Sequence, residues 1–318
     1  MMERRALGNT GLQVAPLVFG GNVFGWTADE KTSFSLLDAW LDAGFNTVDT
    51  ADCYSIWADG NAAGTSESVI GKWFKANPSK REQTVLITKV GADLGDGKKG
   101  LSKRWISEAV EDSLRRLQTD YIDLYLSHWP DPDTGYDETL EAYQTLLKAG
   151  KIRAVGASNL DAAQLQESLE VAKREQLPRY DVLQPEYNLY DRSAFEGPLS
   201  ELCSKENIGV ITYFSLASGF LSGKYQSKQD IVGTQREQFL GKYFDDRGLN
   251  ILKALRQVAE KTQHSAAEVA LAWLISRPAV TAPIASATSL KQLESLAKAA
   301  QLTLSSEDIA LLDQASAE

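Results

Sequence analysis

The amino-acid sequence predicts an α/β fold, a single (β/α)8 barrel in one domain spanning residues 1–318. Eight short apolar runs alternate along the chain with amphipathic segments of roughly 10–15 residues, the pattern of strand–helix units. Each run is almost continuously apolar, which is typical of a parallel sheet buried on both faces. A barrel of this kind uses about 250 residues as one unit, so the 318-residue chain has room for it and for additions.

The chain opens with a hairpin signal, because two short strand-like segments, 5–7 and 12–14, flank Gly8-Asn9-Thr10-Gly11. The eight apolar runs that we expect to form the barrel follow in order: Leu17–Gly21, Thr47–Ala51, Val85–Val90, Ile122–His128, Ile152–Ser158, Val182–Asn188, Ile208–Leu216 and Val280–Ser286.

Helical periodicity and stop or start residues mark the segments between the strands. Gly44 and Gly150 supply C-terminal stops, and several segments begin at Ser or Asp, which cap helix N-termini. The expected crossover helices are Lys31–Ala43, Ser102–Leu117, Asp137–Ala149, Asp161–Glu175, Ser265–Ser276 and Ser289–Ala300.

Two further amphipathic segments, Gly248–Thr262 and Ser305–Ala315, are additional to the strand–helix units of the barrel and predict two extra helices. The polar stretch Tyr225–Arg247 is weakly patterned and predicts a long loop near the barrel mouth.

A doubly wound sheet would need a Gly-rich phosphate turn after an early strand. The nearest candidate, Gly20–Gly25, lacks the GxGxxG spacing, which disfavours that alternative.

Composition argues against several classes of function. With 33 basic and 43 acidic residues, the net charge is -10, which disfavours binding to nucleic acid or to an anionic membrane. The N-terminus has charges but no apolar core of a signal peptide, and no apolar stretch reaches the length of a membrane span. Cys53 and Cys203 form no CxxC pair, so we expect reduced thiols and a cytoplasmic protein. With only two histidines, no zinc site built on several imidazoles is possible, and no metal is expected.

The ends of the predicted strands carry polar side chains. In a parallel barrel the carboxyl ends of all strands meet at one rim, where active sites are built. The side chains that we expect at this rim are Asp49, Lys89, His128, Ser158, Asn159, Gln184 and Tyr213.

A carboxylate, an ammonium group, an imidazole and a nearby phenol suit the reduction of a carbonyl group. Tyr54 follows Asp49 on the loop after the second strand and could protonate the developing alkoxide. Its pKa, about 10 in water, would have to be lowered, and the ammonium of Lys89 could lower it. Asp49 would keep a buried Lys89 charged, and His128 would hydrogen-bond the carbonyl oxygen.

Several sequence blocks occur in a characteristic order along the chain: Arg5–Gly8 with Thr10–Leu12, Asp49–Tyr54, Thr88-Lys89, Ser107–Leu117 leading to Asp120–Tyr125, Ser127–Pro130, Gly150–Asn159, Gln184–Asn188 and Gly219–Tyr225. With these blocks the sequence resembles the aldo-keto reductase superfamily over essentially its whole length.

This resemblance implies a single TIM barrel that is an NAD(P)(H)-dependent oxidoreductase of aldehydes, ketones and alcohols, with small molecules as its partners. It makes Tyr54 the general acid/base, with Lys89, Asp49 and His128 as its catalytic partners. Ser158, Asn159 and Gln184 would hold the nicotinamide carboxamide, and Tyr213 would stack on its face. The turn Ser215–Gly223 would cradle the pyrophosphate through Ser215, Leu216, Ser218 and Gly219.

The C-terminal block departs from the family pattern. Many relatives carry an arginine that pairs with the 2′-phosphate of NADP(H) where this chain has Thr288. Ser286, Thr288 and Gln292 could still contact the cofactor, but loss of a guanidinium weakens selectivity for NADP(H). NADP(H) is the favoured cofactor, with NAD(H) or dual use as alternatives.

Other residues receive less specific roles. Trp26 and Trp129 are expected to touch substrate, and Trp57 less so. We expect Asp52 and Asp123 to be structural, hydrogen-bonded carboxylates, and Cys53 to be a small buried side chain with no base beside it.

Two other functions compete with a reductase. A redox-sensing regulatory protein is one, because potassium-channel β subunits resemble this family and keep its four catalytic residues. A barrel lyase or isomerase is the other, and it predicts no nicotinamide binding. The resemblance names no particular carbonyl or alcohol and sets neither the direction of the reaction nor the oligomeric state.

Overall fold

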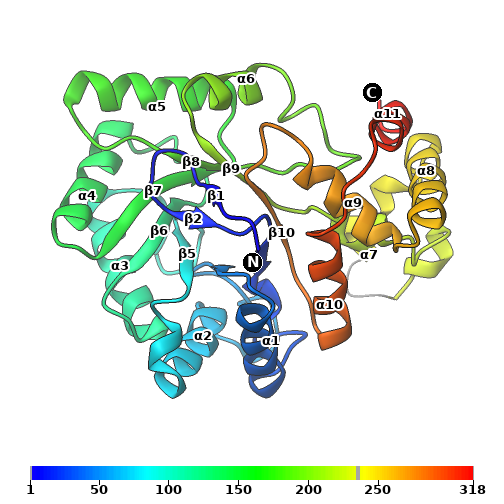
Figure 1. The fold of residues 1–318 in the computed structure, drawn as a ribbon. Helices are drawn as coiled ribbons and strands as arrows, with labels where there is room; N and C mark the ends of the chain where they lie inside the picture. Colours follow the sequence, from blue (N-terminus) through cyan, green and yellow to red (C-terminus); the bar gives the residue numbers. More distant parts are fainter. Residues whose placement is uncertain (1, 234–236, 318) are drawn as a thin grey trace.

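A computed structural model describes residues 2–233 and 237–317, and its centre is a closed barrel of eight parallel strands (Figure 1). Around the barrel the strands follow the order β10-β3-β4-β5-β6-β7-β8-β9. This arrangement confirms the predicted (β/α)8 fold. The strands are β3 (Val18–Gly20), β4 (Thr47–Asp49), β5 (Val85–Val90), β6 (Ile122–Ser127), β7 (Ile152–Ser158), β8 (Val182–Gln184), β9 (Gly209–Thr212) and β10 (Ala282–Ala285).

Small and branched apolar side chains fill the inside of the barrel. Ile87 of β5 pairs in register with Leu124 of β6, and Leu124 pairs with Ala154 of β7. All three belong to the buried interior cluster, which makes the barrel a packed core rather than a pore.

The predicted hairpin closes one end of this core. Strands β1 (Arg5–Ala6) and β2 (Gln13–Val14) pair antiparallel, and Leu7 and Val14 join the interior cluster. Gly8, in the hairpin turn, lies so close to neighbouring backbone that an added Cβ would stand 2.4 Å from the Asp181 carbonyl oxygen. Its φ of +54° is a second reason for glycine at this position.

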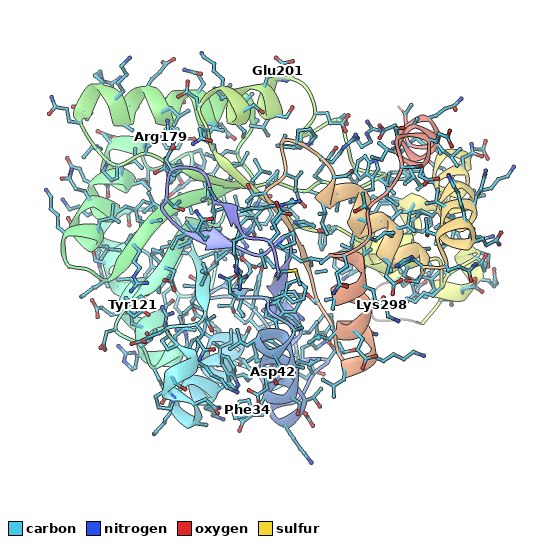
Figure 2. All side chains as sticks on the ribbon, viewed as in Figure 1. Phe34, Asp42, Tyr121, Arg179, Glu201 and Lys298 are labelled. Atoms are coloured by element: carbon cyan, nitrogen blue, oxygen red, sulfur yellow. The ribbon has the colours of Figure 1, made fainter. Side chains whose placement is uncertain are left out.

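Helices surround the barrel, and a second, larger apolar cluster fills the space between the two layers. Charged residues such as Asp42, Glu201 and Lys298 lie on the exposed outer faces of helices (Figure 2). The helices are α1 (Glu30–Asp42), α2 (Thr65–Ala76), α3 (Lys103–Leu117), α4 (Tyr136–Lys148), α5 (Ala162–Glu175), α6 (Pro198–Lys205), α7 (Glu237–Leu240), α8 (Asp246–Thr262), α9 (Ala266–Ile275), α10 (Leu290–Ala299) and α11 (Ser306–Ala315).

The two extra helices that the sequence predicts are α8 and α11. Between β9 and α8, the stretch predicted as a loop contains short helical turns at Lys228–Ile231 and Gly241–Tyr243 and the four-residue helix α7. Residues 234–236 of that stretch lie outside the described residues.

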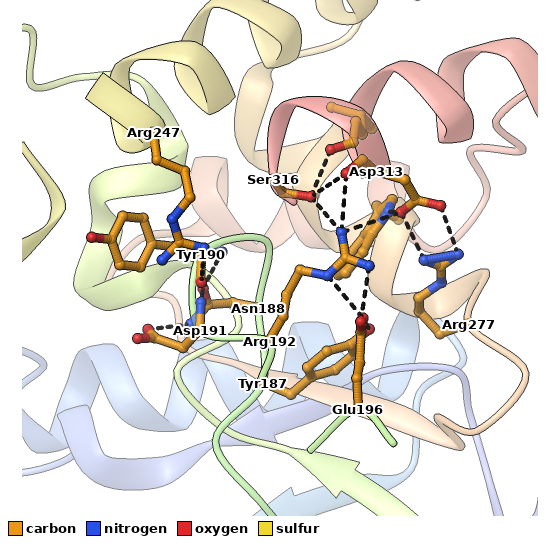
Figure 3. A network of polar contacts seen from close by, with 12 residues as sticks. Tyr187, Asn188, Tyr190, Asp191, Arg192, Glu196, Arg247, Arg277, Asp313 and Ser316 are labelled. Atoms are coloured by element: carbon orange, nitrogen blue, oxygen red, sulfur yellow. Dashed lines mark hydrogen bonds and ion pairs between the residues drawn. The ribbon is translucent and has the colours of Figure 1, made fainter. Parts of the chain in front are cut away.

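A polar network attaches α11 to the segment that follows β8 (Figure 3). The Arg192 guanidinium donates to both carboxylate oxygens of Glu196 at 2.9 Å and to Ser316 Oγ at 2.7 Å. Asp313 of α11 accepts from Arg277 at 2.8 and 3.2 Å. These contacts hold the C-terminal helix against the barrel. Among residues 2–233 and 237–317, the structure has no helix with the length and apolar character needed to cross a membrane.

Candidate active site

The four residues predicted to act together lie together at the carboxyl ends of neighbouring strands. Asp49 is the last residue of β4, Lys89 lies near the end of β5, and His128 follows β6 directly. Tyr54 lies on the turn after β4, with its ring centroid 5.9 Å from that of His128.

Lys89 is the centre of the group. Its ammonium is fully buried and makes three hydrogen bonds, to Asp49 Oδ2 at 2.7 Å, to the Thr50 carbonyl oxygen at 2.7 Å and to Tyr54 Oη at 2.9 Å. An ammonium has three protons to donate, so this geometry satisfies all of them. Lys89 is thereby fixed with one N–H aimed at the phenol oxygen.

Asp49 is held from two sides. Its Oδ1 accepts from Gln184 Nε2 at 2.9 Å, and its Oδ2 accepts from Lys89 and, at a long 3.5 Å, from Tyr54 Oη. Gln184, predicted as a cofactor contact, therefore also positions the carboxylate that partners Lys89.

The protonation state of Tyr54 differs from the expectation. We expected a lowered pKa, but burial and then the charge of Asp49 raise the pKa of Tyr54 well above its ordinary value. The physical reason is that Asp49 offsets the charge of Lys89, so desolvation of the phenolate dominates. Tyr54 is therefore a protonated phenol at neutral pH, with the Lys89 ammonium placed to stabilise a phenolate once the proton has left.

His128 is a neutral imidazole. Burial, and then the nearby charge of Lys89, holds its pKa well below the ordinary value. Its backbone carbonyl accepts from Asn159 Nδ2 at 2.8 Å, which fixes the residue at the rim. A neutral imidazole can donate a hydrogen bond but is a poor proton source, which leaves Tyr54 as the acid of the pair.

The expectation that Cys53 has no base beside it is wrong. Its Sγ lies 3.7 Å from His128 Nδ1, and the side chain is half-buried. Burial and the charge of Asp52 raise the pKa of the Cys53 thiol to about 12, so at neutral pH it is protonated. This contact could not be foreseen from the sequence, because the two residues are 75 positions apart.

The predicted carboxamide-binding residues form one cluster beside Asp49. Ser158 Oγ donates to the Gln184 carbonyl oxygen at 2.7 Å, and Tyr213 Oη donates to Asn159 Oδ1 at 2.6 Å. Amide side chains and an aromatic ring in this position fit the polar edge and the flat face of a nicotinamide.

The predicted phosphate-binding turn follows β9 and reverses sharply. Ala217, Ser218 and Gly219 all have positive φ, at 47°, 57° and 98°. Ser215 Oγ donates to the Thr212 carbonyl oxygen at 3.2 Å, and the Gly219 amide donates to the Leu216 carbonyl oxygen at 2.8 Å. Tight backbone turns of small residues with such angles form concavities that accept phosphate groups.

The predicted C-terminal contacts lie at the end of β10 and the start of α10. Ser286 Oγ donates to Asn22 Oδ1 at 2.7 Å. The backbone amide and the hydroxyl of Thr288 both donate to Gln292 Oε1, at 2.7 and 3.1 Å. Thr288 and Gln292 are thus joined to each other.

Three tryptophans line the mouth beside Tyr54 and His128. Trp129 stacks on His128 with ring centroids 5.7 Å apart, while Trp57 meets both Trp26, at 5.7 Å, and Tyr54, at 6.0 Å, edge to face. Trp57 and Trp129 are 48% and 49% exposed, which leaves much of their surface open to a ligand. Trp57 lies edge to face against Tyr54, so its ring is part of the surroundings of the proposed acid.

The two structural carboxylates behave differently. Asp123 is partnered as predicted, because it accepts from the Leu86 amide at 3.0 Å and pairs with Arg81 and Arg153. The expectation for Asp52 is wrong, since within the described chain neither of its buried oxygens has a hydrogen-bond partner. Burial, and then the negative charge of Glu67, raises the pKa of Asp52 well above its ordinary range.

Comparison with known proteins shows the family of the chain. The sequence model of the aldo/keto reductase family matches residues 16–317. An uncharacterized oxidoreductase of Bacillus subtilis (strain 168), YrpG, is 35% identical over 98% of this chain and 95% of its own length. The aldo-keto reductase YhdN of the same organism is 35% identical, over 96% of this chain and 91% of its own length. A probable voltage-gated potassium channel subunit beta of Oryza sativa subsp. japonica is 34% identical, over 92% and 89%.

A match across nearly the whole chain, with relatives of similar length and identity above 30%, shows common ancestry over the entire barrel. The chain belongs to the aldo/keto reductase family of oxidoreductases.

Proposed function

We propose that this chain, as one domain over residues 1–318, interconverts aldehydes or ketones and alcohols with NAD(P)(H), and that Tyr54 is its general acid/base. The observation that carries the proposal is the 2.9 Å contact between Lys89 Nζ and Tyr54 Oη inside a buried ion pair with Asp49. We further propose a small carbonyl or alcohol compound as its partner and the cytoplasm as its location, from the acidic composition and unpaired cysteines.

The cofactor would lie across the rim, held by the residues that cluster beside Asp49. Asn159, Ser158 and Gln184 would bind the carboxamide, Tyr213 would stack on the ring, and the turn of residues 215–219 would receive the pyrophosphate. When bound, the nicotinamide supplies a hydride to the carbonyl carbon. The family generally uses NAD(P)H; NADP(H) is the favoured form here, and Thr288 makes NAD(H) or dual use the alternative.

Four side chains of the site have the other roles in the proposed reaction. His128, neutral, donates a hydrogen bond to the carbonyl oxygen and orients it. Tyr54 transfers its proton to that oxygen as negative charge develops. Lys89 then stabilises the phenolate through the N–H already directed at Tyr54 Oη, and Asp49 holds Lys89 Nζ in place through its own hydrogen bond. In the oxidation of an alcohol the same contacts operate in reverse.

The tryptophans beside Tyr54 suggest the substrate class. Trp26, Trp57 and Trp129 present flat apolar surfaces around a polar centre, an arrangement suited to aromatic aldehydes. Their exposure also explains why an activated aromatic aldehyde is a reasonable first substrate.

The test follows the absorbance of reduced nicotinamide with such an aldehyde, with NADPH and NADH supplied separately. Tyr54→Phe should lower turnover by about 10²–10⁴-fold, the usual contribution of general acid catalysis, while cofactor binding measured by fluorescence is retained. Tyr121→Phe is the matched control, because Tyr121 precedes β6 at the opposite end of the barrel. Turnover by Tyr54→Phe within twofold of the wild type would show that Tyr54 is not the acid.

A redox-sensing protein is the second candidate, supported by the 34% identity to the rice potassium channel subunit. A sensor keeps the same site but releases its cofactor slowly. Repeated turnover with excess aldehyde supports the reductase, whereas tight cofactor binding with at most one turnover supports the sensor.

A further inference from the structure

Three side chains at the rim form a second group, which shares His128 with the first. The ligand atoms of Asp52, Cys53 and His128 all lie within 4.8 Å of one another. Asp52 and Cys53 come from the turn after β4 and His128 from the end of β6, so the barrel rather than a sequence motif assembles them.

Asp52 shows that this set is incomplete as it stands. Its side chain is 1% exposed, and within residues 2–233 and 237–317 no donor makes a hydrogen bond of acceptable geometry with either oxygen. The backbone amide of Cys53 lies near the carboxylate and favours its charged form, but its geometry falls short of a hydrogen bond to either oxygen. A buried carboxylate without a partner is costly, and it is rarely kept without a ligand or a function.

The nearby cations do not supply that partner. Lys89 forms an ion pair with Asp49 at 2.7 Å, and Arg116 forms one with Glu67 at 2.6 Å. Both act on Asp52 only from a distance.

The donor set and its geometry suit one class of ion. Thiolate, imidazole and carboxylate together are ligands of zinc, whereas Mg²⁺ and Ca²⁺ require six or more oxygen ligands. In a tetrahedral site with Zn–S near 2.3 Å and Zn–N near 2.05 Å, the sulfur and nitrogen lie about 3.6 Å apart. The observed distance between Cys53 Sγ and His128 Nδ1 is 3.7 Å.

We propose that Asp52, Cys53 and His128 bind a Zn²⁺ ion, with the fourth ligand position open to water or to a carbonyl oxygen. Two anionic ligands balance the charge of the ion, and binding releases the thiol proton of Cys53 to solvent. The partly exposed side of Cys53 provides access from the rim. A three-ligand site with one imidazole is compatible with the exclusion of sites built on several imidazoles, but it departs from the expectation, from the sequence, that no metal is bound.

This site goes beyond the proposed reductase function, because its occupancy does not require the chain to turn over a carbonyl. It shares one residue with the proposed reaction, since His128 would serve both the ion, through Nδ1, and the carbonyl oxygen. Metal binding can therefore be measured independently of activity.

The experiment uses tag-free, full-length protein, freed of metal with a chelator and titrated with Co²⁺, which replaces Zn²⁺ in such sites. One equivalent should produce visible d–d bands and a near-ultraviolet thiolate-to-Co²⁺ charge-transfer band. Zn²⁺ should then abolish both, because it binds N/S/O sites more tightly than Co²⁺. The charge-transfer band is specific for a cysteine ligand, so binding to surface carboxylates does not produce it.

Variants identify the ligands. Cys53→Ser should lose the charge-transfer band, and Asp52→Asn should weaken Co²⁺ binding by at least tenfold. Cys203→Ser is the matched control and should retain the band, because Cys203 is buried on α6 away from the other ligands. No charge-transfer band in the wild type, or a band that survives in Cys53→Ser, would overturn the proposal. The wild-type spectrum decides this even if a variant folds poorly.

Discussion

The Asp49 carboxylate and the Lys89 ammonium lie 2.7 Å apart, and their side chains are 2% and 0% exposed. Removal of one partner from such a pair leaves an uncompensated buried charge, which typically costs about 3–5 kcal/mol of unfolding free energy. The pair therefore stabilises the fold only as a pair.

We expect Lys89→Met alone to lower the unfolding free energy by about 3–5 kcal/mol. Lys89→Met leaves the charge of Asp49 buried without a partner. Because Asp49→Asn removes that charge, the double variant should recover a large part of the lost unfolding free energy. Urea denaturation followed by circular dichroism measures all four proteins. Additive losses in the double variant would show that the two charges do not depend on each other.

Asp52, in contrast, should lower the unfolding free energy of the protein at neutral pH. Its folded-state pKa is raised by burial, so its ionisation costs stability at neutral pH and costs nothing below the unfolded pKa, near pH 4. Asp52→Asn should therefore increase the unfolding free energy at pH 7.5, by about 1.4 kcal/mol for each unit by which burial raises the pKa of Asp52, because the amide cannot ionise. The gain should shrink as the pH falls toward 4. A variant less stable than the wild type at pH 7.5, in metal-free buffer, would contradict this account.

His128 makes stability depend on pH in the acidic range. Burial depresses its folded-state pKa, so below about pH 6.5 the unfolded chain binds a proton that the folded chain does not. Each pH unit below that point should cost about 1.4 kcal/mol, until the folded pKa is reached. His128→Gln removes this contribution, and the stability difference between variant and wild type at pH 7.5 and 5.5 measures it. An unchanged difference at the two pH values would mean that His128 titrates normally in the folded protein.

Strand positions were predictable where the apolar run and the strand coincide. Val85–Val90 and Ile152–Ser158 are mostly apolar runs, and β5 and β7 have those bounds. The predicted runs Val182–Asn188 and Ile208–Leu216 extend beyond strands β8 and β9, because the chain leaves the barrel after Gln184 and after Thr212. Apolar loop residues packed under the helices cannot be told from strand residues by hydropathy alone.

Two of the helices that lack a capping side chain, α2 and α6, were missed, whereas α4, which also lacks one, was predicted with the help of the stop at Gly150. Ser102, Asp161 and Ser265 cap α3, α5 and α9 and marked those helices in the sequence. In contrast, α2 and α6 each begin after a glycine, Gly64 and Gly197, that makes no side-chain cap. These two helices are instead defined by tertiary packing against the barrel, which a capping signal does not report.

The candidate site likewise has one part that was predictable from the sequence and one part that was not. Tyr54, Lys89, Asp49 and His128 were predictable because each lies at or just after a strand end, and all strand ends meet at one rim. The contact between Cys53 and His128 and the orphaned oxygens of Asp52 depend on side-chain directions in the folded rim. The direction of the Tyr54 pKa shift was wrong for the same reason, since burial outweighs the neighbouring ammonium only once the pair with Asp49 has formed.

Thr288 offers a test of cofactor preference under the proposed function. Thr288→Arg restores a guanidinium beside Gln292 at the start of α10, where a 2′-phosphate would be bound. A charge-assisted hydrogen bond contributes about 1.5–3 kcal/mol, which corresponds to a ten- to hundredfold increase in the NADPH/NADH ratio of kcat/KM. Thr288→Gln, similar in polarity but uncharged, is the control. A ratio that does not change with arginine would place the 2′-phosphate elsewhere.

Gly71 tests how closely the outer helices pack. It lies in α2, and a Cβ at this position would stand 2.0 Å from the Arg116 carbonyl oxygen and 2.8 Å from the Leu117 carbonyl carbon, both backbone atoms of α3. Gly71→Ala gains about 1 kcal/mol of helix propensity, but it must separate the two helices, and overpacking of this kind costs about 1–3 kcal/mol or more. Because the obstacle is backbone, which cannot rotate away, we expect a net loss of stability in urea denaturation. Gly241→Ala is the matched control, since nothing lies within 4 Å of its added Cβ, and its stability should stay within about 0.5 kcal/mol of the wild type. Equal stability of the two variants would mean that α2 and α3 can separate at little cost.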